Sequence, residues 1–145
     1  MVSSSQSKVC FFFKTKVSLQ HRTKLKKFIE AIIKKEKREL QSLNYIFSTD
    51  KELLEINRQY LKHDYYTDII TFELSGHKYP IEGEVYISVN RVINNAQMLG
   101  EPLYKELHRV IFHGVLHLCG YKDKNKEEKE RMREKEEFFL SHYFK

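Results

Sequence analysis

The segment His113-Gly-Val-Leu-His117-Leu-Cys-Gly120-Tyr-Lys-Asp123 carries the most informative residue spacing in the chain. Its two histidines are four residues apart, and four residues of an α-helix turn by about 400°, so both imidazoles face the same way. Gly120 can adopt the positive φ with which many helices end, and the chain can then turn back and bring Asp123 to the same point. Two helical imidazoles and one carboxylate would leave a fourth zinc position open, as catalytic zinc sites do.

The helix that carries these histidines is expected to be buried, because apolar residues surround the pair on nearly every face from Leu107 to Gly120. Buried imidazoles need partners, and carbonyl or carboxylate groups could satisfy them without a metal. A metal remains the favoured hypothesis, since glycine and aspartate both fall where a third ligand requires them. Cys119 points off the histidine face and is expected in the core, whereas His108 is expected to face solvent.

Gly114 argues against one class of zinc enzyme. Zinc peptidases with the H-E-x-x-H pattern carry a glutamate beside the first histidine as general base, and this chain has Gly114 at that position. A water on the metal would therefore have no carboxylate on the helix to take its proton.

The stretch resembles the YbeY family, a bacterial zinc-dependent group linked to ribosomal RNA maturation, whose signature is similar to H-G-x-L-H-L-x-G-Y-D-H. The matching residues are His113, Gly114, Leu116, His117, Leu118, Gly120 and Tyr121. An upstream segment is similar to the family pattern L-N-x-x-Y-R-x-x-D-x-x-T-D-V-L-S-F, and its matching residues are Asn57, Tyr60, Asp64, Thr67, Asp68 and Phe72. The run Gly83–Ile87 and the helix around Met132 also fit, so the resemblance covers most of the chain.

The third ligand departs from the family pattern. The family has His where this chain has Asp123, and Lys122 stands where the family has Asp. Aspartate binds zinc at about the same bond length as histidine. Its charge should make the metal a weaker Lewis acid, with a more basic bound water.

The second departure is Leu61, which replaces the family's Arg after Tyr60. A guanidinium is the usual bidentate clamp for phosphate. Lys62 or His63 could supply some of its charge but not its fork geometry.

The resemblance implies metal-assisted hydrolysis of an RNA phosphodiester, with zinc held by His113, His117 and Asp123. It also implies ribosomal RNA as substrate, at the 3′ end of the small-subunit RNA, and the small ribosomal subunit as partner. By resemblance the segment 67–72 borders the metal cleft. The candidates are Asp68, Asp64 and His63 for catalysis, and Lys62 and Thr67 for substrate binding. Asp68 could equally well cap the local backbone at the start of a strand. The hydroxyl of Thr67 is expected to have a structural role.

Composition fits one domain spanning residues 1–145, because 145 residues can bury a proper core. The 26 basic residues against 20 acidic ones give a net charge of +6, which favours polyanionic partners. Two cysteines suggest a reducing compartment. The apolar run Val9–Phe13 is too short for a signal peptide core or a membrane span, so a cytoplasmic protein without a membrane partner is expected.

The order of elements predicts an α+β fold, with a single mixed sheet of about four strands, packed helices, and the metal site at the end of a buried helix. The expected strands are 9–13, 44–48, 67–74 and 83–88; the expected helices are one with the stripe Leu25, Phe28, Ile29, Ile32 and Ile33, then 50–60, 92–99, the histidine helix and 126–143. The lysine-rich face of the first helix suits a solvated surface better than a dedicated RNA groove.

Two other functions stay open from the sequence. A non-catalytic ribosome-assembly or RNA-binding factor with a structural zinc is favoured by the missing arginine and the missing glutamate. A small zinc peptidase is disfavoured by Gly114.

Overall fold

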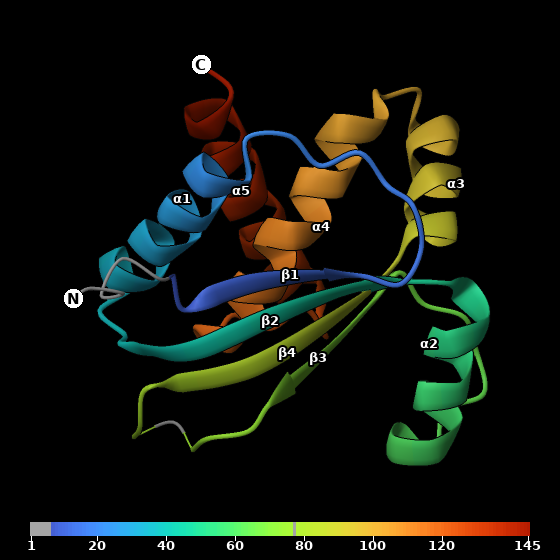
Figure 1. Cartoon of the computed structure of the whole chain (residues 1–145), viewed down its shortest axis with the longest axis horizontal. Helices are drawn as coiled ribbons and strands as arrows, with labels where there is room; N and C mark the ends of the chain where they lie inside the picture. Colours follow the sequence, from blue (N-terminus) through green and yellow to red (C-terminus); the bar gives the residue numbers. More distant parts are fainter. Residues whose placement is uncertain (1–6, 77) are drawn as a thin grey trace.

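The fold is built on one four-stranded mixed sheet, and the computed structural model describes residues 7–76 and 78–145 (Figure 1). The strands lie in the order β1-β2-β4-β3, with β1, β2 and β4 parallel and β3 antiparallel at one edge. Their bounds are Val9–Phe13 for β1, Leu40–Ser48 for β2, Ile69–Glu73 for β3 and Ile81–Ser88 for β4. The predicted α+β class with a single mixed sheet is confirmed.

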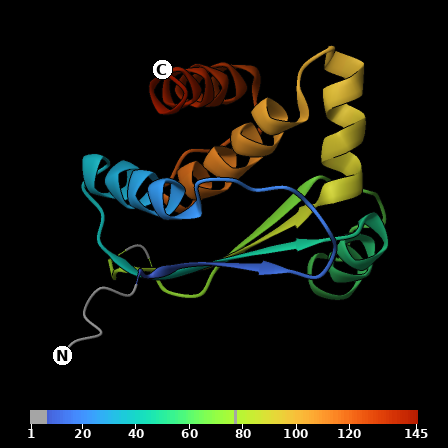
Figure 2. The ribbon, with the colours of Figure 1, turned by 45° about the horizontal axis from the view of Figure 1, so that its top comes forward.

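Most of the helices lie on one face of this sheet (Figure 2). Their bounds are Arg22–Lys35 for α1, Asp50–Ile56 for α2, Val89–Leu99 for α3, Leu103–Leu118 for α4 and Lys126–Tyr143 for α5; Asn57–Leu61 forms a π-helical segment, η1. Helix α4 lies on β3 and β4, and α5 packs on α4 away from the sheet. The histidine helix is therefore enclosed on two sides.

The sequence predicts which helices and strands form, but it predicts the residues at which they begin and end less accurately. The predicted bounds of β1 and α5 are the observed ones. Strand β2 begins at Leu40 rather than at Asn44, and the helix expected to run through Tyr60 leaves α-helical geometry after Ile56. A prediction from apolar alternation alone misses the first half of β2, because Gln41 and Ser42 are both polar and interrupt the alternation.

The core between sheet and helices is formed by alternate residues of the central strands. Tyr45 and Phe47 of β2, with Val85 and Ile87 of β4, are fully buried on the helical side. The Tyr45 hydroxyl donates a hydrogen bond of 2.8 Å to the carbonyl of Ile111 in α4. This bond satisfies a polar group in the core and fixes α4 over the sheet.

Two glycines allow α4 and β4 to approach very closely. A Cβ on Gly114 of α4 would lie 2.9 Å from Val85 Cγ1 and 3.2 Å from Ile69 Cδ1. A Cβ on Gly83 of β4 would lie 2.8 Å from Leu118 Cδ1. Each element therefore has a glycine where the other presents an apolar side chain, and the contact places the histidines of α4 close above the sheet.

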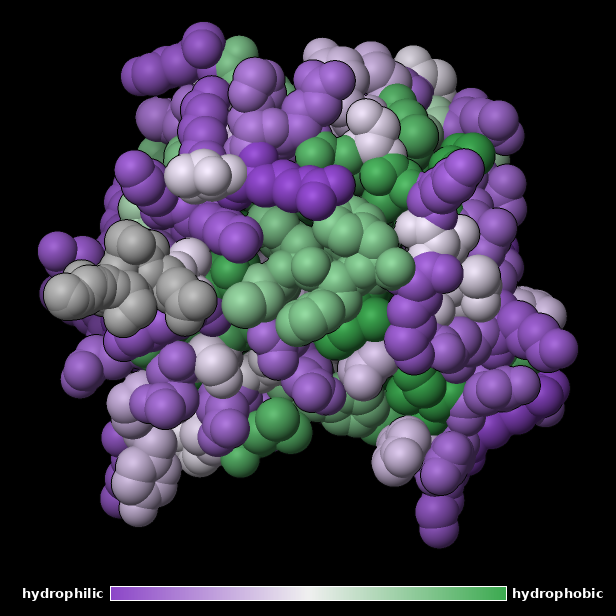
Figure 3. All heavy atoms as spheres, in the orientation of Figure 1, coloured by the Kyte–Doolittle hydropathy of each residue, from purple (hydrophilic) through white to green (hydrophobic). Residues whose placement is uncertain are grey.

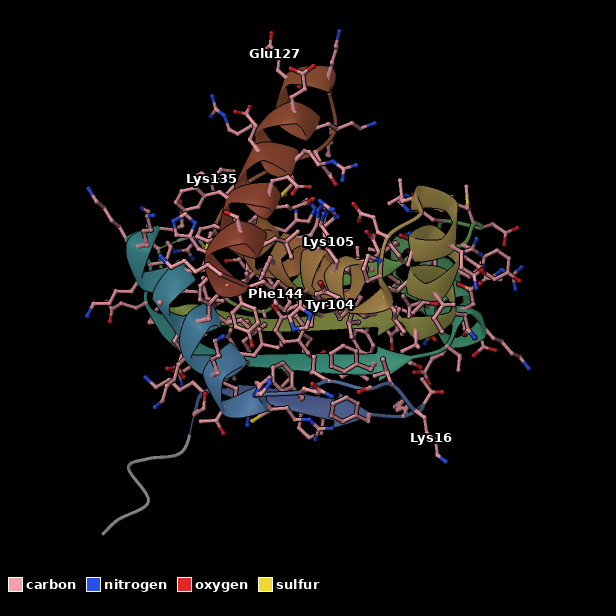
Figure 4. All side chains as sticks on the ribbon, turned by 90° about the horizontal axis from the view of Figure 1, so that it is seen from above. Lys16, Tyr104, Lys105, Glu127, Lys135 and Phe144 are labelled. Carbon is pink, nitrogen blue, oxygen red and sulfur yellow. The ribbon has the colours of Figure 1, made fainter. Side chains whose placement is uncertain are left out.

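The expectation that His108 faces solvent is wrong. His108 is buried, and its ring stacks on Tyr143 with centroids 5.4 Å apart and meets Phe144 edge to face at 4.8 Å. Its Nδ1 lies 2.6 Å from the carbonyl oxygen of Tyr104, and burial lowers its pKa. Figure 4 shows Tyr104 and Phe144 side by side where the end of α5 covers α4. The periodicity of the sequence cannot predict that the end of α5 covers this part of α4.

In Figure 3 an apolar patch lies over β1, and much of the surface around it is hydrophilic. Phe12 of this strand is half exposed. None of the helices in the described part of the chain is both long and apolar enough to cross a membrane.

The glycine contact predicts that Gly114→Ala destabilises the protein. Overpacking costs about 1–3 kcal/mol and outweighs the roughly 1 kcal/mol that alanine gains over glycine in a helix, because Val85 belongs to a buried strand that cannot move away. Thermal unfolding measures the difference. The control is Gly76→Ala, where the new Cβ would meet only Tyr79 at 3.5 Å. Equal melting temperatures for Gly114→Ala and wild type would contradict the close contact.

Candidate metal centre

Three side chains converge at the end of α4 in a geometry that fits a metal ion. The Nε2 atom of His113 lies 3.2 Å from Oδ2 of Asp123, and Nε2 of His117 lies 3.3 Å from the same oxygen. All three ligand atoms lie within 4.8 Å of one another. A tetrahedral ion with bonds of about 2.0–2.1 Å separates its ligand atoms by roughly 3.3 Å, so the spacing suits zinc or an ion of similar size.

The chain returns to the histidines through a glycine turn. Gly120 has φ 109°, which a side chain would disfavour. Its N–H donates to the carbonyl of His117 at 3.0 Å, and the N–H of Tyr121 donates to the carbonyl of Leu116 at 3.0 Å. These two bonds form the Schellman motif, which ends α4 and turns the chain toward Asp123. The order of histidines, glycine and aspartate in the sequence thus produces the convergence.

Both imidazoles are oriented through their second ring nitrogen. Nδ1 of His113 lies 2.6 Å from Oε2 of Glu136 in α5, and Nδ1 of His117 lies 2.9 Å from the carbonyl oxygen of Tyr121. These acceptors place the ring proton on Nδ1 and leave the Nε2 lone pair for a metal. This arrangement is the usual support of histidine ligands in proteins.

The neighbouring charges separate the pKa values of the two histidines. Burial disfavours the charged form of His113, but the hydrogen bond to Glu136 and the carboxylates of Glu136, Asp123 and Asp68 outweigh it, so its pKa is raised. The pKa of His117 is lowered, first by burial and then by the nearby charge of His113. Three carboxylates, those of Glu136, Asp123 and Asp68, thus act on His113, and a divalent cation would neutralise part of their charge.

A buried charge cluster lies behind Glu136. The guanidinium of Arg109 in α4 donates to Glu106 at 3.1 Å, to Glu137 at 2.6 Å and to Glu101 at 3.1 Å, and lies 4.0 Å from Glu136. Burial raises the pKa of Glu106 despite this partner. The cluster ties α5 to α4 and so holds Glu136 against His113.

The three candidate ligands border a cleft of about 1000 Å³. Asp68 lines it on the side of β3, and Oδ2 of Asp68 accepts a hydrogen bond of 3.2 Å from Asn95 in α3. Burial raises the pKa of the Asp68 carboxyl, although the charge of His113 opposes this. An oriented carboxylate with a raised pKa across a cleft from a metal site is suited to accept a proton.

The other candidate residues fall into two groups. Thr67 and His63 also line the cleft, and the Thr67 hydroxyl donates to the carbonyl of Ile69 at 3.2 Å, as a structural hydroxyl would. Asp64 is exposed and paired with Arg58, and the exposed Lys62 has a left-handed backbone; neither belongs to the cleft lining. The cleft beside the three candidate ligands is thus lined by Asp68, Thr67 and His63, but not by Asp64 or Lys62.

Sequence reasoning missed the supporting residues of the site. Glu136 is one of several glutamates in a charged helix, and Arg109 lies among apolar residues of α4. One signal was available for Arg109, since a charged residue on a helix expected to be buried needs a partner. The Tyr121 carbonyl belongs to the backbone and has no signal in the sequence.

Comparisons with known proteins show the family of the chain. A family model described as Endoribonuclease YbeY matches residues 12–144. A protein of Cytophaga hutchinsonii named Endoribonuclease YbeY is 52% identical over 133 residues, covering 90% of this chain and 93% of that protein. A protein of the same name from Karelsulcia muelleri is 41% identical over 130 residues, covering 90% of this chain and 92% of that protein.

A solved structure shares the fold. The solution structure of TM1509 from Thermotoga maritima superposes with a TM-score of 0.64 and 28% sequence identity, covering 94% of this chain and 89% of that one. The family match extends from β1 to the end of α5 and includes the histidine helix. The chain therefore belongs to the YbeY family of endoribonucleases.

Proposed function

We propose that this chain cleaves RNA by metal-assisted hydrolysis, with zinc held by His113, His117 and Asp123. The observation that carries the proposal is the convergence of two Nε2 atoms and one carboxylate oxygen beside a cleft of about 1000 Å³. Family membership supplies the reaction, since the matching relatives are named endoribonucleases. A purely structural zinc would not need an open cleft beside it.

The finer parts of the proposal follow the family resemblance. The substrate is ribosomal RNA at the 3′ end of the small-subunit RNA, the partner is the small ribosomal subunit, and the compartment is the cytoplasm. The net charge of +6 supports a polyanionic substrate, because basic proteins attract nucleic acid over long distances.

The residues around the cleft have separate roles in the proposed reaction. A divalent ion bound by the three ligands would polarise a phosphoryl oxygen and make a water more acidic. Glu136 and the Tyr121 carbonyl hold the imidazoles in the productive tautomer. Asp68, fixed by Asn95, accepts the proton of the attacking water at its carboxylate.

Variants at position 123 test the third ligand. Asp123→Ala and His117→Ala should lose zinc, whereas Asp123→His should retain it, because imidazole binds zinc at a similar distance. Loss of the ion removes about 4 kcal/mol of stabilisation at a zinc concentration 1,000 times Kd. Elemental analysis and thermal unfolding with and without zinc measure both effects. Lys122→Ala is the matched control and should keep its zinc; equal zinc binding by Asp123→Ala and wild type would exclude Asp123 as a ligand.

The two candidate aspartates can be separated by activity. Asp68→Asn should lower the single-turnover rate of RNA cleavage by about 10²–10⁴-fold, the usual contribution of a general base, with zinc content unchanged. Asp64→Asn should cleave at nearly the wild-type rate, because Asp64 pairs with Arg58 outside the cleft. Cleavage by Asp68→Asn at the wild-type rate would remove Asp68 from the mechanism. If the wild type binds RNA but cleaves none, the assembly-factor function replaces the nuclease.

The salt dependence of RNA binding tests which lysines contact the substrate. Lys129 and Arg133 line the cleft, whereas Lys27 and Lys34 of α1 do not. Changing Lys129 and Arg133 to Gln should reduce the log–log salt slope of single-stranded RNA affinity by roughly 1.4, about 0.7 for each lost phosphate contact. Changing Lys27 and Lys34 to Gln should leave the slope almost unchanged. The opposite result would locate the RNA on α1.

A further inference from the structure

An exposed pair of aromatic rings stands at the rim of the metal cleft. His63 and Tyr65 stack with centroids 5.1 Å apart and an interplanar angle of 19°, and both line the cleft. The Tyr65 hydroxyl lies 2.9 Å from Nδ1 of His63. Tyr65 is 55% exposed, so a large part of its ring faces solvent.

The backbone around this pair is held in place. The amide of Asn57, which is only 2% exposed, donates a hydrogen bond of 3.0 Å to the carbonyl of Tyr65. The N–H of His63 donates to the carbonyl of Asn57 at 3.0 Å, after a left-handed turn at Lys62. The backbone that carries the two rings is thus held in place, which reduces the entropy lost when a ligand binds. Because the backbone and not the Tyr65 ring makes these bonds, removal of the ring should leave the loop folded.

Tyr66 is the natural comparison, because it is 54% exposed and adjacent in sequence. Its ring lies under the guanidinium of Arg91 at 5.2 Å, and Arg91 is paired with Asp50 at 2.7 Å. Tyr66 is not part of the cleft lining. Of two adjacent tyrosines with similar exposure, one is therefore turned to the cleft and the other is engaged elsewhere.

The wall of the cleft that α5 forms carries two cations. Lys129 and Arg133 are four residues apart on α5 and line the cleft from that side. The third cation of the lining, Arg109, is occupied by its carboxylates. On the aromatic side Leu61 offers no charge. The cleft thus has one wall that suits phosphates and one that suits flat, uncharged rings.

We infer that Tyr65, backed by His63, is a stacking platform for a nucleobase of the bound RNA, while α5 contacts the phosphate backbone. Every base presents a π-face, and base–aromatic stacking is a principal source of affinity for unpaired nucleotides. The inference rests on the proposed function, because it takes RNA as the substrate. It adds a direction: bases point to the rim formed by residues 63–65, and phosphates point to α5.

The test measures binding separately from cleavage. The full chain is loaded with zinc and mixed in a stopped-flow instrument with a short single-stranded RNA that contains 2-aminopurine, whose fluorescence falls when it stacks. Tyr65→Leu should weaken binding by about tenfold and reduce the quenching, because stacking on an aromatic side chain is lost. Tyr65→Phe should bind like the wild type. Tyr66→Leu, the matched control, should also bind like the wild type.

An abasic nucleotide identifies the contact. In an RNA that lacks the stacked base, Tyr65→Leu and wild type should bind equally. Removing the base and removing the Tyr65 ring delete the same interaction, so their effects on binding are not additive. Equal losses for Tyr65→Leu and Tyr66→Leu, or no loss for Tyr65→Leu, would overturn the platform. So would a Tyr65→Phe variant as weak as Tyr65→Leu, because the contact would then be polar.

Cleavage of the same RNA is followed over longer times to separate this inference from the proposed function. A wild type that never cleaves but binds tenfold better than Tyr65→Leu would support the platform and refute hydrolysis. A wild type that cleaves, with Tyr65→Leu binding equally well, would refute the platform and support hydrolysis.

Discussion

The close contact between α4 and β4 sets the position of everything in the site. Gly114 lies against Val85, and Gly83 lies against Leu118, so at each of these two points a glycine backbone packs directly on an apolar side chain of the other element. His113 is adjacent to this contact and His117 lies one turn further along. Their height above the sheet, and so their distance from Asp68 at the start of β3, depends on the absence of a Cβ at position 114. The glycine at position 114 also takes the place of the glutamate that an H-E-x-x-H zinc peptidase requires, so the same residue that allows the close packing argues against that enzyme class.

The second constraint is the cluster of charged side chains that lies between α4 and α5. Arg109 neutralises part of a group of glutamates that would otherwise repel one another in a buried place, and one of these, Glu136, orients His113. Removing a single partner from such a cluster leaves an uncompensated charge, which is costly. Helix α5 therefore does more than cover the apolar side of α4, because its Glu136 also determines the tautomer of His113, a candidate metal ligand.

The sequence predicted those features that depend on local spacing. The spacing of His113, His117 and Asp123 predicted their convergence, and the glycine at position 120 predicted the turn that makes it possible; that the three bind zinc stays a prediction. The mixed four-stranded sheet followed from the order of elements. Features that depend on contacts between distant segments were missed: His108 is buried because the end of α5 covers it, and Glu136 is distinguished from its neighbours only by the residue it faces.

The loop that carries Asp123 is also fastened to a distant part of the chain. The Tyr121 hydroxyl donates to Glu36 at 3.1 Å across 85 residues, Lys135 lies 3.5 Å from Glu36, and Arg38 donates to the carbonyl of Leu118 at 3.2 Å. The ligand set is therefore complete only when the turn after α1, the end of α4 and α5 are assembled together. Contacts of such sequence separation close late in folding, since their loop entropy must be overcome first. Bound metal would consequently slow unfolding and leave the rate of folding almost unchanged.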